Sequence, residues 1–524
     1  MQGYSGPAIK LDSVSGKTPA KATITLQNNA QLLAGNGNLI EVHDKGELDL
    51  IVDDSRLTGN LFAEDGSRMT VTLQNRAALT GNVINGDSLT LNSGSRWTLA
   101  GDNDLRKLEL GDGRVSFAGA GSNTLTVGEL GGRGTFDMRI NLDNASSDLL
   151  NVTGEANGIH LLNVQNTGTE AVPQSFDALQ VVHTGGGDAQ FGLVGGRADL
   201  GAYSYMLEQQ GNDWFIVGSG RTISPSAGSV LALFNAGPTL WNSELSTLRS
   251  RMGEVRGREE GGGWIRSYGN RFNTSLASGV DYKQKQQGLS FGADGPVAVS
   301  EGHLLLGLMG GYSQSDLDLS RGTSGKVDSY YIGAYGTWLA DDGYYLDGVV
   351  KVNKLHNESK VAMSDGSKSK GNYDTMALGG SVEFGKHIKL TDDYFVEPYA
   401  QLSAVWLDGD SYTLDNGLRA KNDQTQSVLG KVGTTLGRSF ALKDGGVVQP
   451  YVRAAVAHEF SRSNDVKING QRFDNDLFGS RAELGAGLSV SLSERVQVHA
   501  DFDYMKGKHV EQPWGANVGL RVAF

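Results

Sequence analysis

The final stretch of the chain, residues 516–524, limits the fold more strongly than any other segment. Its apolar side chains occupy every second position and alternate with polar or small residues; they are Val518, Leu520, Val522 and Phe524. A side-chain period of two is that of a β-strand with one apolar and one polar face. A terminal strand of this kind, ending on an aromatic residue, is typical of barrels in which lipid covers the apolar face.

The rest of the C-terminal region, residues 261–524, predicts that this strand is one of twelve. The candidate strands begin near Gly263, Gln286, His303, Lys326, Tyr344, Asn372, Tyr394, Thr425, Val447, Arg481, Val496 and Gly515. Lipid offers no hydrogen-bond partner to an open sheet edge, so the strands should close into a 12-stranded antiparallel transmembrane β-barrel. A soluble sandwich would show the same alternation, but it would not explain the apolar terminal strand.

Seven charged residues on the polar faces of these strands are predicted to face the barrel lumen. They cannot face lipid, because each charge would cost about 2–4 kcal/mol near the bilayer midplane. One interpretation is that they hydrate the pore and contact a helix inside it. The other is general lumen polarity without specific pairing. The candidates are Glu383, Lys431, Arg453, Glu459, Asp501, Asp503 and Arg521.

One pore-spanning helix is predicted in the linker, residues 225–260. Gly237–Pro238 provides a break and then a favourable first-turn residue. A helix from Thr239 to Arg256 would be roughly 27 Å long, about the height of a bilayer's hydrocarbon layer. An amphipathic linker on a soluble core is the alternative. Its apolar stripe is Trp241, Leu245, Leu248, Met252 and Val255, and Arg249, Arg251 and Arg256 crowd its last turns.

The N-terminal region, residues 1–224, predicts a right-handed parallel β-helix. The segment Leu57–Asn60 recurs as Leu79–Asn82, a step of 22 residues, and Thr25–Asn28 recurs as Thr72–Asn75. Short imperfect repeats of about this length favour a solenoid over a β-sandwich, which would also show many short strands. Residues 140–220 are richer in aromatics and are predicted to cap the last coil.

The composition and the absence of known motifs exclude several classes of site and partner. The chain has no Cys, which excludes disulfides and thiolate metal sites and suits export through an oxidising compartment. Its net charge of −13 argues against a nucleic-acid partner. No nucleophile elbow or zinc-protease motif occurs, so we predict no catalytic residue, metal or cofactor. The first residues lack the features of a signal peptide, so an exported chain would be mature or trimmed.

On these motifs the chain resembles type Va autotransporters of the pertactin-like group. The expected fold is all-β with one helix: the β-helix, the linker helix and the barrel. The stretch from 148–154 through 212–218 resembles the autochaperone-like end of pertactin-type passengers. Segments 240–244 and 251–256 resemble the linker helix, and segment 262–266 resembles the first translocator strand. By the same resemblance, Val518, Leu520, Val522 and Phe524 match the signal by which the assembly machinery recognises barrels.

The resemblance implies a barrel in the outer membrane that translocates its own passenger and displays it at the cell surface. The implied partners are outer-membrane lipid, the barrel-assembly machinery, periplasmic chaperones and an unknown host ligand, and a monomer is expected. The passenger would be an adhesin or another host-interaction module. The alternatives are the remnant of an autotransporter with an esterase or protease passenger upstream, and a porin-like channel.

The linker departs from the pattern of family members that cut themselves inside the barrel. In those members an Asn attacks its own backbone carbonyl. Here Ser246–Thr247 occupies that position, and a serine hydroxyl cannot form the succinimide. An uncut linker is therefore predicted.

Overall fold

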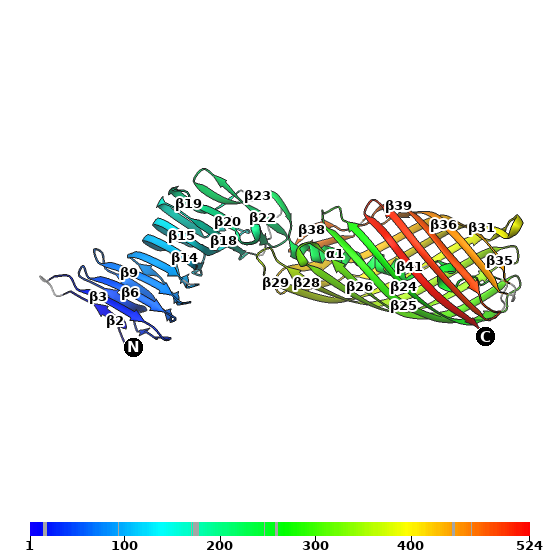
Figure 1. The fold of residues 1–524 in the computed structure, drawn as a ribbon, viewed down its shortest axis with the longest axis horizontal. Coiled ribbons are helices and arrows are strands. Elements are labelled where there is room, and N and C mark those ends of the chain that lie inside the picture. The colour runs from blue at the N-terminus through cyan, green and yellow to red at the C-terminus, as the bar shows by residue number, and fades with distance from the viewer. Residues whose placement is uncertain are drawn as a thin grey trace. The chain divides into compact units, whose positions relative to one another are not determined.

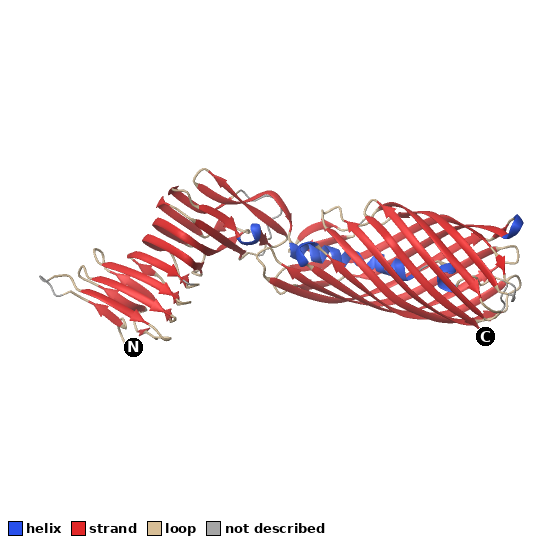
Figure 2. Cartoon of the chain, viewed as in Figure 1, coloured by secondary structure: helices blue, strands red, loops and turns tan. Residues whose placement is uncertain are grey.

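The computed structural model describes residues 1–13, 18–92, 94–168, 170, 178–245, 247–256, 260–442, 446–462 and 464–524. These residues form two compact units. The first comprises residues 1–224 with 364–367, and the second comprises residues 225–363 and 368–524 (Figure 1). Most of the chain is β-structure, and the longest helix belongs to the second unit (Figure 2).

The first unit is a parallel β-solenoid, as predicted. Strands one coil apart pair in parallel and in register, for example Leu57 with Leu79 and Leu50 with Val71. Side chains at these positions are fully buried and stack from coil to coil. A sandwich would instead require antiparallel pairing. The strands up to the last coil are β1 (Gln2–Gly3), β2 (Ile9–Leu11), β3 (Lys21–Leu26), β4 (Leu33–Ala34), β5 (Asn38–Val42), β6 (Glu47–Asp53), β7 (Arg56–Thr58), β8 (Asn60–Ala63), β9 (Arg68–Gln74), β10 (Ala78–Thr80), β11 (Val83–Ile84), β12 (Gly86–Asn92), β13 (Arg96–Leu99), β14 (Asn103–Phe117), β15 (Thr124–Asn141), β16 (Ser146–Ser147), β17 (Leu149–Glu155) and β18 (Ile159–Asn166).

The recurring Gly-Asn pair has a structural cause. The side-chain oxygen of Asn60 accepts a hydrogen bond from the backbone N–H of Asn82 at 3.0 Å, and the side chain of Asn103 donates to that of Asn82 at 3.1 Å. Gly81 has a φ of +143°, and a Cβ there would lie 2.3 Å from the carbonyl oxygen of Gly59. The repeat therefore marks the corner where neighbouring coils approach most closely.

The end of this unit changes to antiparallel pairing. Strand β22 pairs with β23, and β23 also pairs with β19. The side chains of Trp214 and Ile216 on β23 are buried against the last coils. Strands β19 (Leu179–Gly186) and β20 (Gln190–Leu193) still pair in parallel with β17 and β18. The strands added by antiparallel pairing are β21 (Ala198–Leu200), β22 (Tyr203–Gln210) and β23 (Asp213–Ile223).

A buried histidine lies in the aromatic stack that leads into this end. The ring of His160 lies between Phe136 at 5.9 Å and Phe191 at 5.3 Å, and Phe191 contacts Trp214 at 4.7 Å. Its Nε2 donates to the carbonyl oxygen of Asn157 at 3.0 Å. Its Nδ1 is buried without a partner among the described residues. Burial lowers the pKa of His160 below the ordinary value of 6.5, so the folded solenoid favours the neutral ring.

This histidine predicts acid sensitivity of the solenoid. Because its pKa is lower in the folded than in the unfolded state, its contribution is complete above about pH 6.5 and is lost as the pH falls toward the folded-state value. We expect the free energy of unfolding to fall by up to about 1.4 kcal/mol per pH unit in that range. Urea unfolding followed by tryptophan fluorescence measures this. His160→Phe should reduce the pH dependence, and an unchanged dependence would contradict the assignment.

The second unit is a closed antiparallel barrel of twelve strands, as predicted. Strand β24 pairs with both β25 and β41, and β29 pairs with both β28 and β31, which closes the ring. The largest differences from the predicted starts are at β25 and β41, each of which begins five residues earlier than predicted. The barrel strands are β24 (Gly262–Ser275), β25 (Asp281–Val297), β26 (His303–Asp318), β27 (Ser324–Leu339), β28 (Tyr344–Ala362), β29 (Lys368–Lys386), β31 (Tyr394–Asp408), β34 (Gln424–Arg438), β36 (Val447–Glu459), β39 (Gly479–Ser491), β40 (Val496–Gly507) and β41 (Val510–Ala523).

Two connections at the barrel end opposite Phe524 fold into a small sheet of their own. It consists of β32 (Ser411–Thr413), β33 (Arg419–Asn422), β37 (Asp465–Ile468) and β38 (Gln471–Asp474). Asn469 and Gly470 both have positive φ in the turn between β37 and β38, as a two-residue hairpin turn requires. The short strands β30 (Ile388–Lys389) and β35 (Phe440–Ala441) extend neighbouring barrel strands.

The prediction of one helix beginning at Thr239 was wrong. The structure has α1 (Pro225–Leu245) and α2 (Leu248–Met252), and Gly237–Pro238 lies inside α1. Gly237 lies in close packing rather than at a break, since a Cβ there would lie 2.4 Å from the end of the Leu407 side chain. Val255 and Arg256 follow α2 instead of continuing it.

The second helix has its own start and stop signals. Thr247 caps α2 through a reciprocal capping box with Ser250, in which the Thr247 N–H donates to the Ser250 hydroxyl at 3.1 Å. Gly253, with a φ of +72°, ends it. Ser246, on which the expectation of an uncut linker depends, lies outside the described residues.

Candidate functional site: the helices inside the barrel

Helix α1 runs inside the barrel and is buried on nearly all sides (Figure 2). It packs on strands β25 to β28 and on β31 and β34. Its first half is held near the small sheet: the Asn235 side chain donates to the carbonyl oxygen of Asn475 at 2.7 Å and accepts from the Tyr282 hydroxyl at 2.6 Å. Trp241 and Leu245 of the predicted stripe are also buried, but so is the opposite face, because the wall surrounds the helix.

A buried ion pair joins the end of α1 to the wall. The Glu244 carboxylate accepts from Lys351 Nζ at 2.5 Å, Asn353 Nδ2 at 2.6 Å and Ser313 Oγ at 2.7 Å. The side chains of Glu244 and Lys351 are both 0% exposed. Lys351 also donates to the carbonyl oxygen of Trp241 at 3.1 Å. With four polar contacts around two charges, the pair meets the conditions for a stable buried ion pair.

This pair was not predicted from the sequence. Glu244 is the single charged residue of α1, and Lys351 is at an inward position in the alternation of β28. A carboxylate in an otherwise uncharged helix, and a lysine in the inward row of a strand, are the signals that could have predicted it.

The arginines around α2 bind acidic groups at the end of the lumen near Phe524. Arg251 pairs with Asp347 at 2.6 Å. Arg249 and Arg256 share Glu397 at 3.2 and 2.9 Å, and both also pair with Glu254 at 3.0 Å. Leu248 and Met252 of α2 and the following Val255 are buried beside them. The prediction placed three arginines here, and the structure adds the wall carboxylates that they contact.

The seven lumen candidates are mostly engaged with other wall residues. Among the described residues, Arg453 is the candidate that hydrogen-bonds to the linker, through the Thr247 hydroxyl at 3.3 Å, and it also pairs with Asp503. Arg521, 1% exposed, makes two hydrogen bonds to Asp294 at 2.6 and 2.7 Å. The remaining partners are Tyr345 for Glu383 at 2.9 Å, Glu483 for Lys431 at 2.7 Å, Ser427 for Glu459 at 2.5 Å, and Asn517 for Asp501 at 3.0 Å.

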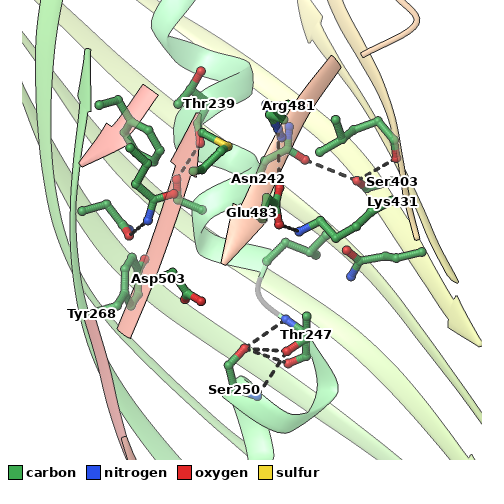
Figure 3. A pocket seen from close by; sticks show the side chains of 18 of the residues that line it. Thr239, Asn242, Thr247, Ser250, Tyr268, Ser403, Lys431, Arg481, Glu483 and Asp503 are labelled. Atoms are coloured by element: carbon green, nitrogen blue, oxygen red, sulfur yellow. Dashed lines mark hydrogen bonds and ion pairs between the residues drawn. The ribbon is translucent and has the colours of Figure 1, made fainter. Parts of the chain in front are cut away.

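A polar cavity of about 150 Å³ lies beside the junction of α1 and α2 (Figure 3). Asn242 and Thr247 border it from the helix side, and the wall side includes the ion pair between Lys431 and Glu483. The side chain of Asn242 accepts from the Ser403 hydroxyl at 3.4 Å. A polar cavity of this size is suited to water, and it lies on the side of the lumen that the helices leave unfilled.

The outside of the barrel is broadly apolar. On the terminal strand the side chains of Val518, Leu520, Val522 and Phe524 are 37–75% exposed. Trp406 and Trp514 are also exposed on barrel strands. An apolar surface that extends around a closed sheet is the surface that lipid would cover. Among the helices of the described residues, none combines the length and the hydropathy needed to cross a bilayer.

Comparisons with known proteins agree with this architecture. The model of the autotransporter β-domain matches residues 263–503, and that of pertactin matches residues 105–217. The pertactin autotransporter of Bordetella bronchiseptica is 33% identical over 508 residues, 87% of this chain and 55% of the relative. The autotransporter adhesin/invasin TibA of Escherichia coli is 33% identical over 546 residues, 91% of this chain and 55% of the relative.

The chain thus spans about half the length of these two relatives. Among solved structures, the β-domain of the Bordetella autotransporter BrkA is 31% identical, covers 51% of this chain and all of its own length, and has a TM-score of 0.44.

Proposed function

The chain belongs to the autotransporter family, and on that premise we propose that α1 and α2 are the pore-spanning end of a translocated polypeptide. In this proposal the barrel lies in the outer membrane, and buried ion pairs retain the helices once the solenoid is outside the cell. The observation that carries it is the pair between Glu244 and Lys351, both 0% exposed. A pair placed so deeply fixes one position of the helix, because any shift would leave two charges without partners.

The arginines of the α2 segment support the same role at the other end of the lumen. Arg249, Arg251 and Arg256 cover Asp347 and Glu397 on the wall. The six lumen candidates other than Arg453 pair with residues of the wall. In this proposal they keep the lumen polar and hydrated without binding the helices. We propose the same hydration role for the cavity beside Thr247.

We further propose that the displayed solenoid acts by binding, as an adhesin. The support is the relative named as an adhesin/invasin, which is 33% identical over most of this chain. The proposal also includes the barrel-assembly machinery and periplasmic chaperones as partners, with the apolar terminal strand as the assembly signal. An esterase or protease passenger is the competing class, and a hydrolase domain in a longer reading frame would favour it.

Protease treatment of intact cells tests the display. We expect it to release residues 1–224 and to leave residues 261–524 with the cells, because the barrel is covered by lipid and filled by its helices. Cells lysed before treatment serve as the control for periplasmic material. Release of the solenoid only after lysis would contradict surface display.

The linker makes a second prediction. Because Ser246 cannot cyclise on its backbone as Asn does, we expect heated outer membranes to show one band of the intact chain on SDS gels. Replacing Ser246 with Asn places the missing nucleophile at this position and serves as the comparison. A stable fragment of barrel size from the unaltered chain would contradict the prediction.

A further inference from the structure

One face of the solenoid carries no outward carboxylate over four neighbouring strands. It consists of β7, β10, β13 and the second half of β14, which pair in parallel and in register. Its outward residues form two columns. One column is Arg56, Ala78, Arg96 and Arg114, and the other is Thr58, Thr80, Thr98 and Ser116. In a chain with a net charge of −13, this block is a local positive surface, which we call the arginine face.

The neighbouring face of the same coils is different. There Arg68 and Arg106 both pair with Asp87, at 3.3 and 2.7 Å. On the arginine face, by contrast, Arg56 and Arg96 are exposed and form no ion pair with any residue that the structure describes. Arg68 and Arg106 are therefore neutralised within the protein, whereas Arg56 and Arg96 are available to a partner.

The geometry of the arginine face suits an extended anion. Arg96 lies beside Arg114 on the next strand, a spacing of about 4.8 Å, and like charges in this position destabilise a sheet. Arg114 is neutralised by Asp137, whereas Arg96 is not. Arg56 and Arg96 flank Ala78 at about twice that spacing, and the small alanine leaves open space between them. Asp54 lies in the bend before β7, and Asp112 lies at the irregular point inside β14, where it faces Arg133 at 3.8 Å.

We propose that the arginine face binds a linear anionic polysaccharide, bearing sulfate or carboxylate groups, along the solenoid axis. Guanidinium groups form parallel hydrogen bonds to such anions, and their rigid planar geometry makes them better suited to this than lysine. The column of threonine hydroxyls can hydrogen-bond to the sugar. The ligand's chemistry rests on the proposed function, because a glycan outside the cell meets this face only if the passenger is displayed.

The test uses the full chain purified in detergent and three immobilised probes: heparin, alginate and neutral dextran. We expect salt-sensitive binding to at least one of the two anionic probes and none to dextran. Arg56→Gln with Arg96→Gln should weaken that binding at least about tenfold. The matched control, Arg68→Gln with Arg106→Gln, removes the same charge from the paired face and should keep the wild-type affinity.

Each outcome decides the proposal. Preference for heparin or for alginate would support it and identify the anionic group. If both double variants weaken binding equally, the attraction is due to net charge alone, and the proposal is overturned. Failure of the wild-type chain to bind either anionic probe would also overturn it. Because the protein is purified, a failure of display on cells would appear in the protease experiment and not here.

Discussion

Replacing Lys351 with methionine is expected to open the barrel intermittently. The change leaves the Glu244 carboxylate buried without its cation, at a cost of about 3–5 kcal/mol. A loss of that size raises the population of the unplugged state at least a hundredfold. In planar lipid bilayers, the measurement is the frequency of large, brief conductance steps, which should be rare for the wild-type chain and common for the variant.

Two controls separate the ion pair from general damage. Glu244→Met combined with Lys351→Met removes both charges, so it should restore most of the closure, because a buried pair replaced by apolar groups is often neutral in stability. Val352→Met changes the next residue of the same strand, whose side chain is 37% exposed on the outside, and should leave the openings rare. A double variant that opens as often as the single one would contradict the role of the pair.

Replacing Arg139 with alanine is expected to be among the most damaging single changes in the solenoid. Asp148, 0% exposed, accepts hydrogen bonds from the Arg139 N–H at 2.8 Å and from its guanidinium at 2.9 Å. The guanidinium also donates to the carbonyl oxygens of Gly119 and Gly121 at 2.6 and 2.9 Å. Its removal leaves a buried carboxylate without a cation, so we expect the free energy of unfolding to fall by about 3–5 kcal/mol.

Arg133→Ala is the matched control for this prediction. Arg133 is only six residues away and faces Asp112 at 3.8 Å, but their side chains are 76% and 80% exposed. Such a pair contributes less than about 1 kcal/mol. Urea unfolding of the full chain in detergent, followed by tryptophan fluorescence, compares the two variants. Similar losses of stability for both would show that the contacts of Asp148 are not what stabilise this region.

The strands of the barrel can be predicted from the sequence because lipid imposes a strict alternation on them. Leu378 and Val382 are exposed on the outside of β29, while Glu383 is buried on the inside. The solenoid is predictable for a related reason. The corner near Gly81 and Asn82 allows few residue types, so the same Gly-Asn pair recurs after 22 residues.

The helices were harder to predict because they lie inside the barrel, where the wall surrounds them. They do not lie at a surface with one buried and one exposed face. An apolar stripe assumes one buried face, whereas α1 is buried nearly all round. The wall partners of the linker were missed for another reason. Lys351 and Glu244 are 107 residues apart, and local patterns of polarity carry no information about pairing at that distance.

The central claim is that the second unit is a lipid-embedded barrel closed by the chain's own helices. Its most direct test is the single-channel conductance of the intact chain beside a variant that lacks residues 225–256. We predict small or no steady conductance for the intact chain and a large, permanently open pore for the variant. A large steady pore in the intact chain, or the same conductance in both, would contradict the account.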